Sequence, residues 1–374
     1  MSEIDSTGLF DLLRERHIPF ALYRLPGDAP ARLMLQYSSM PMELADVAEL
    51  PSLPGFLMAP FPVNGGESTY LLRPDIECAV DEALLLAGDQ LRSCTLFQHL
   101  PFPGNTTATV TRDAYVERVR TAVDTIRKGE FSKVIISKSK QLQRPEGFRP
   151  EKLFDDLCKA YAHAMIFYWQ LPGVGSWLGA TPEILMSETD GRIVTLSLAG
   201  TQAVGSGAVE NTCWGVKEIA EQAFVSRYIV QLLDKMGVED MVIDGPKNFR
   251  AGNLVHLATA FEFDADHLRV SRGRFAAALY PTPAIAGLPR DESLWYIQAS
   301  EGYNRSYYSG LAGPVRMRQE THLYVMLRCM QLFDDQLVFY SGAGITASSD
   351  PEKEWQETEN KMKTLLNVID DCQL

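Results

Sequence analysis

The sequence predicts an α+β protein in which mainly antiparallel β-sheets are covered by helices. Two observations support this. Short strand-like runs outnumber the helical segments, and the two kinds of segment do not alternate strictly along the chain. Parallel sheets require such alternation, whereas antiparallel sheets are built from neighbouring strands and hairpins. With 374 residues, 46% of them hydrophobic, the chain is long enough to bury a large core.

The first hundred residues predict one short helix followed by strands. Apolar or alternating runs are broken there by Pro, Gly and Asp, which is typical of strands joined by turns. The helix is expected at residues 8–15, and the strands at residues 20–25, 32–37, 55–61 and 69–72. No pattern in this part indicates catalytic or binding chemistry. Residues 101–105 form the clearest linker.

The middle of the chain predicts helices and strands in mixed order. A helical period that starts near Asp113 ends at Gly129, and Asp190-Gly191 is typical of a hairpin turn. Helices are expected at residues 113–128, 150–162 and 215–236. Strands are expected at residues 133–137, 165–171, 176–178, 183–187 and 192–198.

The last third predicts a strand, two helices and a meander before a final helix. The helices are expected at residues 272–279 and 291–301, and the strands at residues 254–263, 307–317, 322–333 and 336–340. A Gly-rich turn is expected at residues 341–345. Asp350 and Pro351 are an ordinary N-cap and first position of a helix.

Composition narrows the classes of partner. The formal net charge of −13 disfavours nucleic acid and anionic membrane surfaces. A small anionic substrate would need a local cluster of Lys and Arg. The six scattered cysteines are typical of reduced thiols, and no apolar run approaches the ~20 residues that span a membrane. Because the first residues also lack a signal-peptide pattern, we expect a cytoplasmic protein that contacts neither nucleic acid nor membrane.

The C-terminal helix presents carboxylates and a cation on one face. Glu354 and Glu357 are three residues apart, and Lys361 lies four residues further on. Beside backbone N–H groups freed by the glycines Gly342 and Gly344, they could hold a divalent ion and a carboxylate. The alternative is a solvated helix with an ordinary Glu–Lys pair.

The helix expected at residues 215–236 repeats this geometry. Glu218 and Glu221 again share one face. Four carboxylates offered in pairs from two helices suit Mg²⁺, whereas Zn²⁺ is disfavoured because neither His nor Cys accompanies them. The alternative is that both helices are simply solvated.

Two further residues are candidates for proton transfer. Lys133 opens an apolar strand, where partial desolvation would lower its pKa toward the range of a general base. Glu183 stands at the head of another apolar strand, where burial would raise its pKa and make it a general acid. The alternatives are a strand-end lysine in contact with water and an edge-strand glutamate.

Arg328 and His256 interrupt apolar runs. Arg328 follows Tyr324 to Leu327 and is either a buried anion ligand or a residue on the solvent face of a strand. His256 lies inside an apolar strand and by default is a core histidine whose hydrogen bonds are satisfied.

Together these stretches resemble the chorismate-utilising enzymes, the family of isochorismate, anthranilate component I, aminodeoxychorismate and salicylate synthases. The resemblance runs from about residue 112 to 368, roughly two thirds of the chain. It is carried, in order, by Lys133 to Lys138, Gly179 to Glu183, Leu198 to Thr201, Lys217 to Glu221, Leu254 to Thr259, Tyr280 to Ala284, Arg328-Cys329 and Gly342 to Lys361.

The resemblance implies one large domain over residues 1–374, with two stacked, mainly antiparallel sheets flanked by helices. Residues 112–368 would form the chorismate-binding core, and residues 1–105 would complete the sandwich. The site would lie in a cleft between the sheets. The resemblance also implies a monomer that needs no amidotransferase subunit.

The resemblance further implies a role for each candidate. Mg²⁺ would be held by Glu221 and Glu357, with Glu218 and Glu354 acting directly or through water. Lys133 would be the general base and Glu183 the general acid. The ring pocket would be lined by Ala199, Gly200, Thr201 and His256, and the pyruvyl carboxylate would be bound by Arg328, Lys361 and the backbone of Gly342, Ala343 and Gly344.

Three details resemble the isochorismate synthase branch. Lys occupies position 133, where amine-transferring members usually carry Gln, and the loop at 281–284 reads Pro-Thr-Pro-Ala. Ala199 stands where covalent aminodeoxychorismate synthases place a lysine.

Gln222 and Gln356 depart from the family pattern, which usually has His and Arg there. The alternatives are a salicylate-forming or amine-transferring enzyme and a non-catalytic chorismate-binding protein, and whether the product would serve menaquinone or siderophore synthesis stays open.

Overall fold

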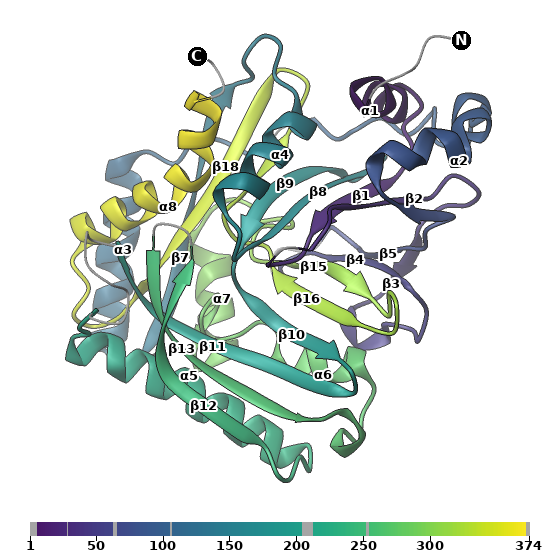
Figure 1. Ribbon diagram of the computed structural model, residues 1–374. Coiled ribbons are helices and arrows are strands. Elements are labelled where there is room, and N and C mark those ends of the chain that lie inside the picture. Colours follow the sequence, from purple (N-terminus) through teal and green to yellow (C-terminus); the bar gives the residue numbers. More distant parts are fainter. Residues whose placement is uncertain are drawn as a thin grey trace.

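The computed structural model describes residues 6–27, 29–62, 66–104, 107–203, 212–251 and 254–371. Two nine-stranded sheets make up its centre (Figure 1), and every pairing between the described strands is antiparallel. The predicted fold class, α+β with two stacked antiparallel sheets and flanking helices in a single domain, is confirmed.

The first sheet contains the strands that begin or end near the candidate catalytic residues. Its order is β14 (Gly287–Leu288), β7 (Lys133–Gln143), β18 (Gln336–Ile345), β17 (Cys329–Leu332), β9 (Gly175–Thr181), β8 (Met165–Leu171), β1 (Phe20–Arg24), β2 (Arg32–Leu35) and β6 (Ile76–Cys78).

The second sheet is ordered β12 (Val242–Ala251), β13 (Leu254–Asp264), β11 (Arg192–Ala203), β10 (Ile184–Thr189), β16 (Thr321–Val325), β15 (Leu311–Val315), β4 (Gly55–Ala59), β5 (Thr69–Leu72) and β3 (Met42–Leu44). The strands from the first eighty residues extend one edge of each sheet. Neither sheet is therefore built from one half of the chain alone.

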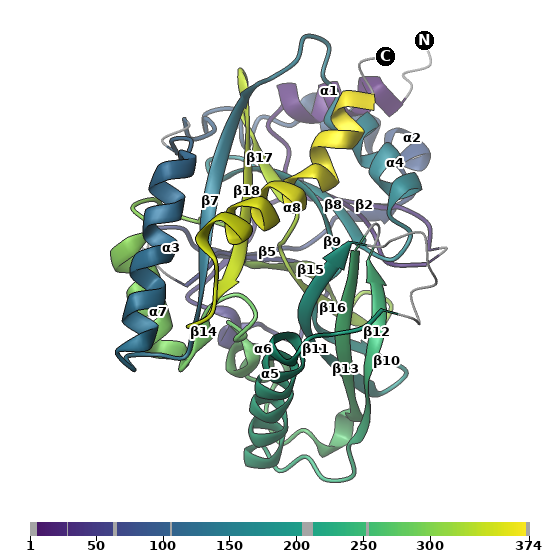
Figure 2. The ribbon, with the colours of Figure 1, turned by 90° about the vertical axis from the view of Figure 1, so that its left-hand side faces the viewer.

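Helices cover the outer faces. They are α1 (Ser6–Glu15), α2 (Val80–Ser93), α3 (Arg112–Arg127), α4 (Pro150–Ala160), α5 (Val216–Lys235), α6 (Arg272–Leu279), α7 (Arg290–Ser300) and α8 (Pro351–Asp371). Helix α8 lies along β18 and next to α3, while α5 packs on β11 and β13 (Figure 2). No helix in the described ranges is long and apolar enough to cross a membrane.

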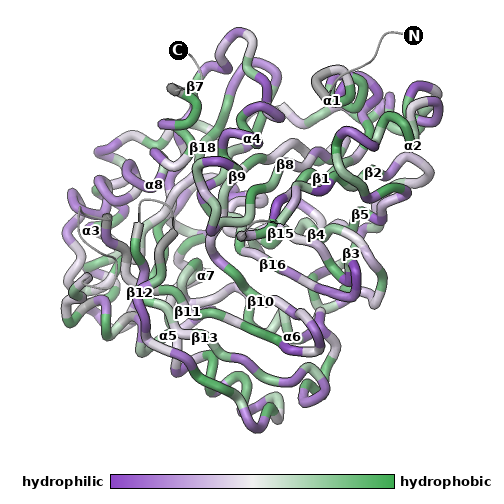
Figure 3. Tube along the Cα trace, viewed as in Figure 1, coloured by the Kyte–Doolittle hydropathy of each residue, from purple (hydrophilic) through white to green (hydrophobic). Residues whose placement is uncertain are grey.

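Hydrophobic residues concentrate along the interior strands, whereas hydrophilic and hydrophobic residues are mixed along the outer helices (Figure 3). One buried cluster between the sheets is rich in aromatic rings. Trp177 stacks on Tyr340 with ring centroids 5.4 Å apart, and Trp169 meets Tyr307 edge-on at 5.0 Å. Such pairs add to the stabilisation from burial alone.

Several predicted elements were wrong or missing. Helix α2 and strands β3, β6 and β12 were not predicted, and β7 runs six residues past its expected end at Ser137. Strand β12 contains Gly245-Pro246, which resembles a turn in sequence. An edge strand tolerates Gly245-Pro246 because a register shift between Asp244 and Lys247 leaves these two residues without partners in the ladder between β12 and β13.

Two corrections bear on the site. The run expected as one strand at residues 322–333 is two strands, β16 in the second sheet and β17 in the first. The Gly-rich turn expected at residues 341–345 is instead the end of β18, where Gly342 pairs with Ser137 and Gly344 with Ile135.

Candidate active site

One cavity between the two sheets brings together most of the residues predicted to form the site. These are Lys133, Glu183, Gly200, Glu218, His256, Arg328, Gly342, Gly344, Glu357 and Lys361. They come from both sheets and from helices α5 and α8. Because they are distant in sequence, only the fold places them in one cavity, which we call the central cavity.

Strand β18 leaves room for Lys133 through its glycines. Tyr340, Gly342 and Gly344 alternate along the strand and line the cavity together with Ser341. A Cβ atom on Gly344 would lie 3.0 Å from the Cε atom of Lys133, closer than such atoms normally approach. Ala343 points the other way and is buried in the core at 1% exposure. The glycines thus act mainly by lacking side chains, and Ala343 does not line the cavity.

Glu183 lies between β9 and β10 and is 8% exposed. Its backbone is held on both sides, since its N–H donates to Thr181 Oγ1 (3.3 Å) and its carbonyl accepts from Val325 N–H (2.9 Å). Burial raises the pKa of its carboxyl group to about 7, although Arg328, Lys133 and Lys361 lower it. Near neutral pH this side chain therefore holds a proton that it can release.

Arg328 stands where the chain passes from one sheet to the other. It belongs to neither β16 nor β17, and its φ of 47° lies in the left-handed region that non-glycine residues seldom adopt. Its Nη1 donates to Thr364 Oγ1 at 3.2 Å. Desolvation lowers its pKa from the ordinary arginine value. Arg328 lines the central cavity and belongs to no strand, so the alternative of a residue on the solvent face of a strand does not hold.

Helix α8 brings Lys361 to the same cavity. The helix begins as predicted, because the Asp350 carboxylate accepts from the N–H groups of Glu352 and Lys353, both at 3.0 Å. Lys361 Nζ lies 2.7 Å from Glu357 Oε1 and donates to the Gly342 carbonyl at 2.8 Å. These two contacts fix the ammonium group over β18.

His256 faces the cavity in a neutral form. Its Nδ1 lies 3.0 Å from the carbonyl oxygen of Gly200, which can only accept, so Nδ1 carries the proton. Burial lowers the pKa of the ring to about 3. The backbones of Ala199 and Thr201 belong to β11, but their side chains lie outside the described residues.

The predicted metal ligands are placed only in part. Glu218 and Glu357 line the central cavity from two helices. Glu354 is 4% exposed and near Tyr115 rather than along the cavity, and the side chain of Glu221 lies outside the described residues. Within the ranges that the structure describes, no three His, Cys, Asp or Glu side chains gather as a cation site. Two carboxylates still fit a hard cation that keeps several waters.

Gln222, one of the two departures from the family pattern, is buried behind Glu218 on α5. Its Nε2 donates to Ser197 Oγ at 2.7 Å and to Thr259 Oγ1 at 2.8 Å. The amide nitrogen thus joins α5 to β11 and β13, while its Oε1 is buried without a hydrogen-bond partner among the described residues.

Sequence reasoning missed several lining residues, among them Tyr308 and Ser309. The Ser309 hydroxyl is buried without a hydrogen-bond partner among the described residues, and its φ is 62°. The only sequence signal was a small Ser-Gly pair inside an apolar run, which is too common to indicate a site.

Two antiparallel sheets enclose Lys133, Arg328 and Lys361 together with Glu183, whose carboxyl pKa burial raises to about 7, and these features define a protein with a site for a small anion. The family model of the chorismate binding enzymes matches residues 89–370, and the chain belongs to this family. The predicted resemblance is thereby confirmed.

The chain is similar to isochorismate synthase DhbC of Bacillus subtilis, with 27% identity over 267 residues that cover 68% of this chain and 67% of the relative. It is also 27% identical to isochorismate synthase MenF of Escherichia coli over 323 residues, covering 81% and 73% of the two chains. The solved structure of MenF superposes with a TM-score of 0.74 at 22% identity, covering 94% of this chain and 88% of the other, and this likeness bears on the fold alone.

Proposed function

We propose that this protein is an isochorismate synthase, an isomerase that converts chorismate to isochorismate reversibly. The observation that carries the proposal is the pairing of Lys133 with Glu183 on one cavity, the latter with a pKa of about 7. A base and an acid are what an exchange of one allylic alcohol for another requires. The isochorismate synthases among its relatives support the same choice.

In the proposed reaction, Lys133 accepts a proton from water while the water oxygen bonds to ring carbon two. The ring double bonds shift, and the bond from carbon four to its hydroxyl breaks. Glu183 donates its proton to the departing oxygen, so one water enters and one leaves. Each positioned proton transfer typically contributes ~10²–10⁴ in rate.

The remaining cavity residues bind and orient the substrate. Arg328 and Lys361 neutralise the pyruvyl carboxylate, which gives a net acidic protein the local positive charge that it needs. His256 lines the ring side of the cavity. Mg²⁺, held by Glu218, Glu357 and neighbouring glutamates, would supply positive charge for the ring carboxylate.

The test is to incubate the protein with chorismate and Mg²⁺ in water labelled with heavy oxygen and to identify the product by chromatography and mass spectrometry. We expect incomplete conversion to an isomer that contains one labelled oxygen, and the same mixture when the reaction starts from isochorismate. Added ammonia or glutamine should change nothing.

Other products would overturn the proposal. Free pyruvate with the fluorescence of salicylate would indicate a lyase, and an ammonia-dependent aromatic amine would indicate the amine-transferring branch. Chorismate binding without turnover would indicate a non-catalytic protein.

A further inference from the structure

A second cavity lies on the first sheet near the start of the chain. We call it the distal cavity. Its volume is ≈ 510 Å³, and its walls include Arg14, His17, Arg144, Gln170 and Phe333. Sites for small molecules usually measure about 300–1,000 Å³.

The distal cavity is separate from the central one. Lys133 opens β7, and Arg144 directly follows the last residue of that strand, so about 35 Å of extended chain lies between them. None of the described residues lines both cavities. A ligand in the distal cavity therefore cannot touch a substrate bound near Lys133.

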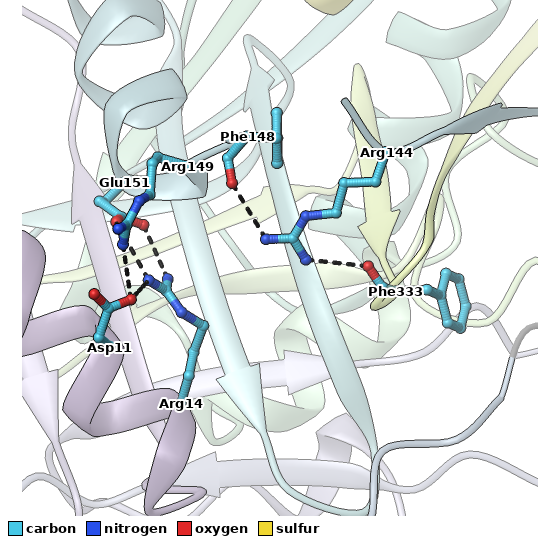
Figure 4. Close-up of polar contacts among 7 residues, drawn as sticks. All are labelled: Asp11, Arg14, Arg144, Phe148, Arg149, Glu151 and Phe333. Carbon is cyan, nitrogen blue, oxygen red and sulfur yellow. Dashed lines mark hydrogen bonds and ion pairs between the residues drawn. The ribbon is translucent and has the colours of Figure 1, made fainter. Parts of the chain in front are cut away.

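Arg144 provides a positive charge that forms no direct ion pair within the described part of the chain, although Asp334 and Glu151 lie near enough to stabilise it. Its guanidinium donates to the backbone carbonyls of Phe333 (3.2 Å) and Phe148 (3.3 Å), as Figure 4 shows, and lies over the Phe148 ring. Among the residues that the structure describes, no carboxylate lies within ion-pair distance of it. Its remaining N–H donor capacity is therefore available to an anion.

The neighbouring arginines differ in this respect. Arg14 is 2.7 Å from Asp11 and 2.9 Å from Glu151, and Arg149 is also 2.7 Å from Asp11 (Figure 4). Their charges are balanced within this network. Arg149 does not line the distal cavity, which makes it a matched control for Arg144.

Gln170 is a second, independent indication of a ligand. The side chain belongs to β8 and is 3% exposed, and its Nε2 is buried without a hydrogen-bond partner among the described residues. A buried amide donor without an acceptor is unfavourable, and a ligand oxygen would satisfy it.

The other walls limit the kind of anion. Phe102, which stacks on His17 with ring centroids 5.5 Å apart, and Phe333 offer apolar surface for a ring. Asp334 and Asp335 also line the cavity, and their charges disfavour a ligand with more than one negative charge.

We propose that the distal cavity binds a small aromatic monocarboxylate. Its carboxylate accepts from the Arg144 guanidinium and the Gln170 amide, and its ring packs between Phe102 and Phe333. This proposal does not depend on the reaction proposed for the central cavity.

The experiment measures benzoate binding by ligand-observed NMR titration of the full chain. We expect saturable binding to the native protein. Arg144→Met and Gln170→Met should each raise the Kd at least about tenfold, as the loss of a hydrogen bond to a charged group does. Arg149→Met should leave the Kd unchanged. Circular dichroism of each variant verifies folding.

A further variant identifies the cavity that is occupied. Lys361→Met removes a cation from the central cavity and should not alter the Kd. If Lys361→Met abolishes binding while Arg144→Met retains it, benzoate occupies the central cavity and the proposal is wrong. Absence of binding to the native protein, or an equal Kd in native and Arg144→Met protein, also overturns it.

Discussion

At the scale of single residues, the environment of Glu183 leads to a prediction about pH. Its carboxyl must be protonated to act as a general acid, and its pKa of about 7 makes activity fall as the pH rises beyond that value. Glu183→Gln should lower kcat by roughly two to four decades with a smaller change in KM. The pH profile of kcat, measured with both proteins, checks this, and near-native turnover in the variant would exclude the role.

The same pKa has a consequence for stability. The pKa of this carboxyl is near 4.5 in the unfolded chain and about 7 in the folded protein, so the folded protein binds the proton more tightly. The unfolding free energy that this group contributes is therefore lost as the pH rises from about 4.5 to 7. Relative to Glu183→Gln, the native protein should therefore lose about 3 kcal/mol of unfolding free energy over that window. Urea unfolding at several pH values measures this without reference to catalysis.

The absence of a side chain at Gly344 leads to a prediction about the position of the Lys133 side chain. An added methyl group would lie 3.0 Å from Cε of Lys133 and displace this flexible side chain rather than the backbone. We expect Gly344→Ala to fold normally and to lose about tenfold to a hundredfold in kcat, the usual effect of displacing a reacting group. Gly88→Ala, in helix α2, is the control and should leave kcat unchanged. Equal kcat in both variants would contradict this interpretation.

Residue types in the site were largely predictable from sequence, whereas their surroundings were not. Glu183 and Lys133 were singled out because each stands at the start of an apolar strand-like run. Ala343 was included with its glycine neighbours, but alternation along β18 turns it into the core. Tyr308 and Ser309 escaped notice because their positions depend on contacts between distant segments.

At the scale of elements, helices α5 and α8 direct carboxylates into one cavity. Glu357→Gln should weaken Mg²⁺ binding strongly, because a neutral amide is a poorer ligand for a hard cation. Calorimetric titration of each protein with Mg²⁺ measures this Kd directly. Glu352→Gln is the control on the same helix, since Glu352 is exposed and pairs with Arg112 at 2.6 Å. Mg²⁺ binding unaffected by Glu357→Gln, or full turnover in excess EDTA, would contradict the metal assignment.

The boundary between β16 and β17 shows why element prediction failed at the site. The apolar run from Tyr324 to Leu332 satisfies a strand pattern throughout, and only the left-handed backbone of Arg328 reveals the break. Backbone strain of this kind is set by tertiary contacts and leaves no signal in residue type. The failure therefore occurs where the chain changes sheet and turns a guanidinium toward the cavity.

At the scale of the whole molecule, the fold class followed from the order of strand-like and helical runs, but the strand order did not. Sheets of nine strands mix segments from the whole chain, and pairings such as β1 with β8 join residues about 150 positions apart. Local patterns contain no information on such partners. The resemblance to a family therefore predicted the two-sheet arrangement where periodicity alone could not.

A buried ion pair leads to the last prediction, about global stability. Glu301 and Arg305 are 1% and 2% exposed, and their charged atoms are 2.6 Å apart. Arg305 also donates to the carbonyl of Ile135 (2.8 Å), while Glu301 accepts from the N–H of Ser137 (2.7 Å), so the pair ties the segment after α7 to β7. Arg305→Met would leave a buried carboxylate uncompensated and should cost about 3–5 kcal/mol in urea unfolding.

Two further variants separate the charge from the lost packing. Adding Glu301→Gln to Arg305→Met removes the uncompensated charge, keeps an oxygen that accepts from Ser137, and should restore much of the loss. Arg120→Met breaks an exposed pair with Glu117 (3.4 Å) and should cost less than about 1 kcal/mol. If Arg305→Met and Arg120→Met cost the same, the buried pair does not hold β7 in place. In that case the position of Lys133, at the start of the strand, must depend on the ladders of β7 with β14 and β18.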